Sequence, residues 1–443
     1  MAQRPETGTI GSMTSGLARA ARRFGWGVGD QALSSLTNVA LGILVARSLT
    51  VGDFGAFNLA FSTYLIGMSV ARSIATQPLV IRYSACSNEE WRFGTASATG
   101  AGIAVGAVMG TGCILFGVVS GGPMGAAFVS LGWLMPGLLL QDCWRFAFFA
   151  RGRGLAAFIN DLLWAVVLFL VYGVLIVTNR SSIGWLVLGW GGAAVIAGLV
   201  GIWQARVIPS LRLSTAWLRD HRDLSTRFIG ESIASSGATQ FAFYGVGAVA
   251  GLTAVGAIRA AMIVLGPLHI LFIGLGMVAV PEGARLLARS PEKLRRISIL
   301  LAGFLGLAAV VWGILAYYLP ASIGTELLGD SWQPARRVLI PLTIMMAGGG
   351  VTAGASSGLR ALGAARRILR AGVTAAALVV GCAVTGAALG GAAGAAWGYA
   401  IAITAASAVW WRQFTKGLGD HVGGQTASES ERAPSMPGTA GAV

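Results

Sequence analysis

Six ionisable side chains interrupt the apolar stretches of the sequence and are the first candidates for chemistry. They are Asp30, Arg72, Asp161, Glu231, Arg259 and His269. A charged side chain in the middle of a membrane-spanning helix costs about 2.5 to 3.5 kcal/mol on insertion scales, so it usually has a function or a partner inside the protein. Carboxylates and histidine can exchange protons or bind a cation, whereas a guanidinium offers a planar fork of donors to phosphate.

Asp30 and Glu231 lie at a similar depth, near the start of two apolar stretches. Burial raises the pKa of a carboxyl group and allows proton exchange near neutral pH, so we expect these two residues to couple or gate movement of a substrate. Asp161 and His269 are further candidates for this role. The alternative is that the carboxylates cap or pack helices and that His269 is a packing residue.

Arg72 lies ten positions before Arg82 and hence about 15 Å from the inner end of its predicted helix. This depth prevents easy snorkelling, and we expect Arg72 to bind the phosphate of a substrate. The alternative is a buried ion pair with Asp30 or Asp161. The two are compatible, because a pair that opens when an anion arrives gives that anion different affinities for two states. Arg259 is a second candidate for substrate binding, with snorkelling as its alternative.

Other polar residues form a secondary set of candidates. Gln31 and Asn58 could bind sugar hydroxyl groups or tie helices together. Four arginines close the predicted fourth and tenth spans and could gather an anionic headgroup from the inner leaflet, although membrane topology alone also explains them. They are Arg145, Arg151, Arg360 and Arg366.

The composition is that of an all-α polytopic membrane protein. Of the 443 residues, 55% are hydrophobic and 11% are charged, against the usual quarter for charged residues. With about 20 apolar residues per span, about twelve helices are predicted, in two lobes of six. The predicted segments are an N-terminal tail (1–23), a first lobe (24–205), an amphipathic linker at the cytoplasmic interface (206–227), a second lobe (228–412) and a disordered tail (413–443).

Basic residues set the expected orientation. Lys and Arg number 32 and Asp and Glu 17, which gives a net charge of +15. On the twelve-span arrangement, most of the basic residues fall on the side that carries both termini, which predicts that both ends are cytoplasmic. Since these residues alternate with membrane spans, nucleic acid is not an expected partner.

Several classes of protein are excluded by missing motifs. The sequence has no Gly-Lys-Ser/Thr loop, no Rossmann glycine fingerprint and no His-Glu-x-x-His helix, and its four cysteines have no Cys-x-x-Cys spacing. We therefore expect no nucleotide hydrolysis, no metal site and no cofactor, and we do not expect an enzyme.

The two predicted halves show a weak internal repeat. An offset of 201 positions superimposes Gly29 and Asp30 on Gly230 and Glu231, and Gly55 and Ala56 on Gly256 and Ala257. An even number of spans in each half makes the repeats parallel, related by an axis along the membrane normal, which is typical of transporters. Chance matching among abundant Gly and Ala is the alternative.

Short motifs near the N-terminus resemble a known family. The stretch 29–38, then Ala46-Arg47-Ser48-Leu49 and Gly52-Asp53-Phe54-Gly55, resembles the opening of polysaccharide-biosynthesis proteins in the multidrug/oligosaccharidyl-lipid/polysaccharide exporter superfamily. The Arg-x-x-x-x-Ala-Arg pattern that closes the fourth and tenth predicted spans is also similar to theirs. The resemblance implies a V-shaped transporter in a bacterial inner membrane that flips a lipid-linked, pyrophosphate-bearing saccharide by alternating access.

The same resemblance implies the partners and leaves rivals open. Membrane lipids, a proton or sodium ion, and glycosyltransferases or a polymerase of the same pathway are the implied partners. Lipid II flippases are a sister branch with two further spans and cavity arginines that are not recognisable in this sequence. Cation-coupled drug antiporters are another branch, and Asp30 in the first helix keeps that alternative open. A membrane scaffold for glycosyltransferases is the third reading.

Overall fold

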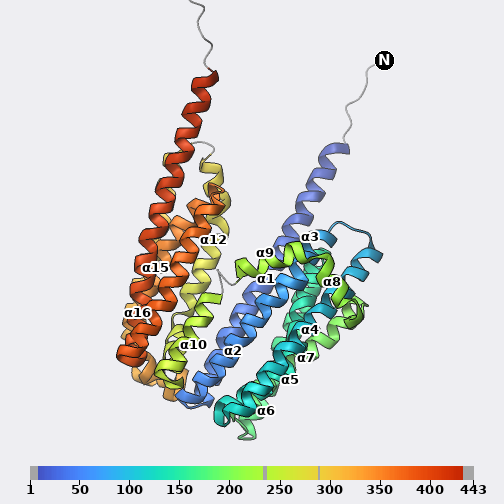
Figure 1. The fold of residues 1–443 in the computed structure, drawn as a ribbon, viewed down its shortest axis with the longest axis vertical. Helices are drawn as coiled ribbons and strands as arrows, with labels where there is room; N and C mark the ends of the chain where they lie inside the picture. The colour runs from blue at the N-terminus through green and yellow to red at the C-terminus, as the bar shows by residue number, and fades with distance from the viewer. Residues whose placement is uncertain (1–7, 233–236, 288–289, 433–443) are drawn as a thin grey trace, which may run out of the picture. The chain divides into compact units, whose positions relative to one another are not determined.

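The computed structural model describes residues 8–232, 237–287 and 290–432, and within these ranges the chain forms helices and no strand (Figure 1). The first part contains α1 (Gly8–Ser48), α2 (Val51–Ala71), η1 (Arg72–Thr76), α3 (Gln77–Tyr83), α4 (Asn88–Ser120), α5 (Gly122–Ala150), α6 (Gly154–Val177) and α7 (Ile183–Ala205). Then follow η2 (Leu211–Leu213), α8 (Ser214–Asp220), α9 (Arg222–Ser232), α10 (Ala238–Ala250), α11 (Leu252–Val264) and α12 (Gly266–Leu287). The last part contains α13 (Pro291–Tyr317), α14 (Ala321–Leu328), η4 (Gly329–Ser331), α15 (Trp332–Ala361) and α16 (Ala365–Arg432).

The helices agree with a multi-pass membrane protein. Nine helices in the described ranges are long and apolar enough to cross a bilayer, and a tenth span is formed if α11 and the first part of α12 are taken together across a 58° bend. The backbone leaves helical geometry at Gly390 and Gly391, which divides α16 into two helices. Helices α9 and α10 lie in the seventh predicted span, but neither is long enough to count among these nine or ten, so the number of about twelve spans remains a prediction.

The chain divides into two compact units. Unit 1 takes in Met1–Val264, Leu319–Val338 and Val384–Ala395, and unit 2 takes in Leu265–Tyr318, Leu339–Ala383 and Ala396–Val443. In unit 1, α5 packs against α2, α4, α6 and α7. In unit 2, the core includes Leu294 of α13, Leu359 of α15 and Phe414 of α16. The lobe boundaries inferred from the sequence remain predictions.

Two glycines one repeat apart make a reciprocal contact inside unit 1. A Cβ atom on Gly55 of α2 would overlap the carbonyl oxygen of Leu252, and one on Gly256 of α11 would overlap that of Val51. Both overlaps are well inside the 3.0 Å that real Cβ atoms keep from other atoms. Since the four residues match at the offset of 201, this crossing agrees with a parallel internal repeat.

The second span contains one turn of π-helix. Helices α2, η1 and α3 form a continuous segment, Val51–Tyr83, and the π-turn covers Arg72–Thr76. The backbone N–H of Gln77 donates to the carbonyl of Arg72, five residues earlier, as a π-turn requires. Such turns occur mostly as single insertions in α-helices and often at functional sites. This turn carries one of the membrane-embedded arginines.

The linker after α7 packs on the helices of unit 1. Trp217 of α8 is 3% exposed and joins a core cluster that includes Leu79 of α3 and Trp91 of α4. The backbone N–H of Ser210 donates to the carbonyl of Ala96 at 2.9 Å. Trp217 of this segment is thus buried in protein, and the expected place of the segment along the cytoplasmic interface remains a prediction. We call the segment from η2 to α9 the connector.

The packing of the connector is expected to weaken in acid. His221 is buried and stacks on Trp217 with ring centroids 3.9 Å apart, and its burial lowers the pKa of the imidazole. Protonation is therefore costlier in the packed state than in the released one. The neutral imidazole of His221 therefore stabilises the packed connector fully above its ordinary pKa of about 6.5. This stabilisation is lost as the pH falls through that value towards the lowered pKa.

Hydrogen exchange of residues 214–225, corrected for intrinsic rates, should be faster at pH 5.5 than at pH 7.5. His221→Phe retains the stack and should remove the pH effect; an equal effect in that variant would exclude His221 as its origin.

Candidate functional site

Five charged side chains from α1, η1, α5 and α6 of unit 1 form one cluster inside the protein. Arg145 of α5 donates from Nε to Oδ2 of Asp30 in α1 at 2.6 Å, and the same Nε lies 3.5 Å from Oδ2 of Asp161 in α6. Arg72 of η1 donates from Nε and Nη2 to the two carboxylate oxygens of Asp142 in α5, at 2.9 and 2.7 Å. Three carboxylates thus share two guanidinium groups, and the cluster has a formal charge of −1.

The cluster is held by helix geometry and by buried amides. Asp142 and Arg145 are three residues apart and so lie on one face of α5. Gln141 donates from Nε2 to Oδ1 of Asp161 at 2.8 Å. Asn160, next to Asp161, donates from Nδ2 to the carbonyl of Ala197 at 2.8 Å. These bonds orient the α6 carboxylate towards Arg145.

One oxygen of Asp30 stands out within this network. The residue is 0% exposed, and its Oδ1 has no hydrogen-bond partner among the described residues. A buried carboxylate oxygen without a donor is costly, whereas a proton or a cation beside it relieves that cost. Together with the excess of one negative charge, the geometry is suited to take up a single positive charge.

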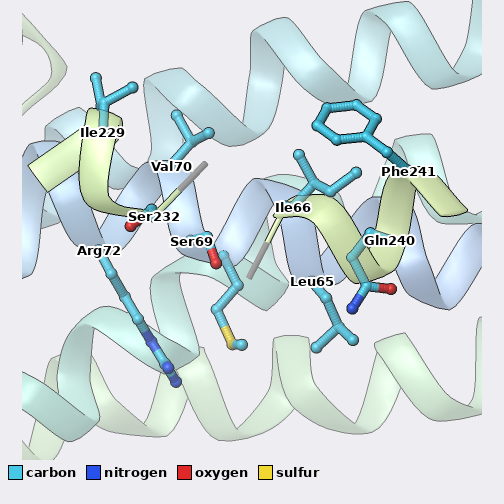
Figure 2. A pocket seen from close by; sticks show the side chains of 11 residues that line it. Leu65, Ile66, Ser69, Val70, Arg72, Ile229, Ser232, Gln240 and Phe241 are labelled. Atoms are coloured by element: carbon cyan, nitrogen blue, oxygen red, sulfur yellow. The ribbon is translucent and has the colours of Figure 1, made fainter. Parts of the chain in front are cut away.

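Arg72 also borders a cavity of about 230 Å³ in unit 1. The cavity lies among α2, η1, α9 and α10, and Figure 2 shows the Arg72 side chain extending away from Ser69 and Ser232. Its polar lining consists of Ser69, Arg72, Ser232 and Gln240, and the rest is apolar. The Arg72 side chain is 28% exposed, whereas that of its partner Asp142 is 5% exposed. An anion can therefore approach the arginine more easily than a cation can approach the aspartate.

Arg259 is linked to this cavity through Gln240. Its Nη2 donates to Ser62 Oγ at 2.9 Å and to Gln240 Oε1 at 3.3 Å. Its guanidinium carbon lies 3.8 Å from the ring centroid of Phe243, a cation–π contact. The arginine is thus fixed within the protein by neighbouring helices and does not need to reach a membrane surface.

The other residues proposed from the sequence take different positions. Gln31 accepts from Arg145 Nη2 at 3.4 Å, and Asn58 donates to the carbonyl of Phe54 in its own helix at 2.7 Å. Arg151 donates to the carbonyl of Cys86 at 2.9 Å. The side chain of Glu231 lies outside the described part of the chain. His269, Arg360 and Arg366 are exposed and belong to unit 2.

The structure corrects two expectations about the arginines. The ion pair considered for Arg72 with Asp30 or Asp161 is formed with Asp142. Arg145, expected at the inner end of the fourth span with its charge near the headgroups, is five residues inside α5, and its side chain is 15% exposed. The reason is that α5 continues to Ala150, one turn beyond the predicted end of the span.

Sequence reasoning left out the polar residues that complete the cluster. Asp142, Gln141 and Asn160 are not among the candidates proposed above from the sequence. The available signal was an Asp and an Arg three residues apart in an apolar stretch, together with an Asn-Asp pair in the next one. In the described residues no group of three or more His, Cys, Asp or Glu has a geometry that could hold a metal ion.

Comparisons with known proteins identify the fold. Neither the family models nor the curated proteins match the sequence. Among solved structures, an inward-facing multidrug resistance MATE transporter of the MOP superfamily has a TM-score of 0.66 at 16% identity, covering 87% of this chain and 94% of that chain. The lipid II flippase MurJ in an inward closed conformation has a TM-score of 0.66 at 11% identity, covering 93% of each chain. A MATE protein in complex with MaL6 has a TM-score of 0.51 at 15% identity, covering 88% and 94%. The chain therefore has the fold of the transporters of the MOP superfamily.

Proposed function

We propose that the protein is an alternating-access transporter that flips a lipid-linked anionic saccharide from one leaflet to the other. The observation that supports this substrate class is the partly exposed side chain of Arg72, a residue that lines a cavity with both polar and apolar walls. Phosphate requires the first property, and a lipid chain and sugars require the mixture of the second. We further propose that the membrane is a bacterial inner membrane with both termini on the cytoplasmic side, as the distribution of basic residues predicts.

The Arg72–Asp142 pair supplies a way to couple binding to a conformational change. An incoming phosphate competes with Asp142 for the same guanidinium nitrogens, and a bidentate fork binds either group well. Asp142 then loses its partner in a buried site, which is unfavourable unless helices rearrange around it. The substrate thus has different affinities for two states, which is the requirement for driving a transition.

The size of the cavity limits what it can bind in the observed state. Its volume of about 230 Å³ is below the range of roughly 300 to 1,000 Å³ of pockets for drug-sized ligands. It therefore accommodates the phosphate end of a lipid-linked saccharide, while the remainder lies elsewhere. Arg259, through Gln240, and Gln31 and Asn58 are proposed as secondary substrate contacts.

A cation-coupled antiporter is the second candidate, and a different observation favours it. Three carboxylates with two guanidinium groups leave one negative charge, and Asp30 Oδ1 has no partner among the described residues. A proton or sodium ion taken up at Asp30 and Asp161 would neutralise the cluster. In that case the gradient of this ion drives transport, and the exported compound is a cationic drug or toxin.

Substitution of Arg72 tests the flippase proposal. In proteoliposomes with a fluorescent polyprenyl-pyrophosphate disaccharide, Arg72→Ala should lower the flipping rate by about tenfold to a hundredfold, the loss typical of a hydrogen bond to a charged group. Arg72→Lys should retain part of the rate, because lysine keeps the charge and loses the fork. Arg285→Ala is the control, since its guanidinium is exposed and pairs with Glu282 three residues away.

Two outcomes would overturn the substrate assignment. One is an unchanged flipping rate for Arg72→Ala. The other is export of a cationic dye that depends on a proton or sodium gradient and is abolished by Asp30→Asn, which would establish the antiporter. If the protein is a scaffold for glycosyltransferases, neither cargo moves in proteoliposomes of the parent protein.

A further inference from the structure

A proline follows the π-turn that carries Arg72. Pro78 has no backbone N–H, and in a regular helix its ring would clash with the carbonyl of the residue four positions earlier, Ile74. The π-turn Arg72–Thr76 inserts one extra residue just before the proline and relieves this clash. The carbonyl of Ile74 nevertheless lacks its usual α-helical donor, within a segment that spans the membrane.

The missing donor comes from the connector. Nε1 of Trp217 donates to the carbonyl oxygen of Ile74 at 3.0 Å, across 143 positions of sequence. The indole ring contacts His221, at a centroid distance of 3.9 Å, and Tyr83, at 5.6 Å, and the rings of these two residues are 6.0 Å apart. A 3% exposed tryptophan in contact with two other aromatic rings has little freedom, so the bond is preorganised. The connector thereby gives the carbonyl of Ile74 a donor from outside the second span.

The connector also contacts this span on both flanks of the carbonyl of Ile74. Ser232 Oγ lies 2.9 Å from Ser73 Oγ, within hydrogen-bond distance. On the other flank, Arg82 donates to Asp223 Oδ2 and to the carbonyl of Asp220, both at 2.9 Å. The π-turn is therefore enclosed by contacts to one and the same connector.

The π-turn determines how two arginines are oriented relative to each other. Each residue of an α-helix turns the chain by about 100°, so removal of the extra residue would rotate one flank against the other by that angle. Arg72, on one flank, faces Asp142 of α5, whereas Arg82, on the other, faces Asp223 of the connector. The π-turn therefore sets the orientation of these two ion pairs relative to each other.

We propose that Trp217 is a positioning residue for Arg72. By satisfying the carbonyl of Ile74, it stabilises the π-turn and thereby directs Arg72 to Asp142 and to the cavity. Packing of the connector and orientation of Arg72 are consequently coupled, and release of the connector alters the affinity of Arg72 for an anion. The effect on substrate rests on the proposed function, whereas the coupling itself does not.

Hydrogen exchange of the full chain in lipid nanodiscs tests the coupling. Trp217→Phe keeps an aromatic ring and removes the N–H, so peptides covering 72–77 should exchange about tenfold faster, the ratio expected for one lost hydrogen bond. Labelling of Arg72 by phenylglyoxal should also accelerate. The matched control is Trp164→Phe, because Trp164 Nε1 also donates to a backbone carbonyl, that of Trp190, at 3.3 Å. The residue four positions after Trp190 is Ala194 and not a proline, so this carbonyl keeps its usual helical donor.

A second background separates positioning from general loosening. Pro78→Ala restores an N–H that can serve the carbonyl of Ile74, so Trp217→Phe should have no further effect on residues 72–77 in that background. The proposal is overturned if Trp217→Phe behaves like Trp164→Phe, if exchange rises equally in α13, or if the full effect persists with Pro78→Ala. These readouts require no transport. Normal flipping by Arg72→Ala would therefore contradict the flippase proposal and leave the coupling between Trp217 and Arg72 unaffected. Conversely, a failure of the exchange tests would contradict the coupling and leave the flippase proposal unaffected.

Discussion

Replacing Gly55 by alanine should destabilise the protein by at least about 3 kcal/mol, the upper range for an overpacked site. The added methyl group would overlap the carbonyl oxygen of Leu252, and a backbone atom cannot turn aside as a side chain can. Gly256→Ala should have a comparable effect through the carbonyl of Val51. The midpoint of thermal unfolding of each purified variant, followed by fluorescence-detected size exclusion, measures the loss.

Gly112→Ala in α4 is the matched control, because nothing lies within 4 Å of the added Cβ. Alanine is the better helix former by about 1 kcal/mol, so this variant should be as stable as the parent or more so. If Gly55→Ala is as stable as Gly112→Ala, α2 and α11 do not cross through their backbones. The reciprocal backbone contact of Gly55 and Gly256 would then no longer support the internal repeat.

Replacing Arg145 by glutamine is the second change with a large expected effect. It leaves Asp30, 0% exposed, and Asp161, 4% exposed, without their shared counter-charge. Removal of one partner of a buried ion pair costs about 3 to 5 kcal/mol, mainly because the other charge stays buried. Thermal unfolding of the variant should therefore occur well below that of the parent.

A second substitution distinguishes charge from packing as the cause. Asp30→Asn, added to Arg145→Gln, removes the uncompensated charge at similar volume and should recover part of the lost stability. Arg285→Ala, which breaks an exposed pair, should cost no more than about 1 kcal/mol. A double variant as unstable as Arg145→Gln alone would mean that the guanidinium acts through packing.

The overall architecture followed from local and compositional properties. Apolar stretches of about 20 residues identify spans whatever their partners are, and the offset of 201 that matches Gly55 with Gly256 agrees with a contact in the structure. Asp30, Arg72 and Asp161 were identified as unusual for the same reason, since a charge in an apolar stretch is visible without a fold. Burial of these charges was thus predictable from sequence.

Their partners were not predictable, because pairing depends on where each helix ends. Asp142 lies eight residues before Ala150, the last residue of α5, and so about 12 Å inside the helix. The apolar stretch alone predicts that the fourth span ends near position 146, which places Asp142 close to the headgroups, where membrane topology explains a charge. The π-turn is a second example, because Trp217, which donates to the carbonyl of Ile74, comes from a segment 143 positions away that only the fold brings next to it.

The two-glycine break in α16 has a consequence for biosynthesis. Gly391 has a positive φ of 57°, and a Cβ on Gly386 or on Gly394 would overlap the carbonyl oxygen of the other residue. The last two spans are therefore a closed helical hairpin with backbones in contact and no charged residue at the bend. When these two helices are synthesised, no polar loop lies between them that could remain in water after the first helix has inserted. We expect the hairpin to enter the bilayer in a single event, after which the rest of the C-terminal half packs around it.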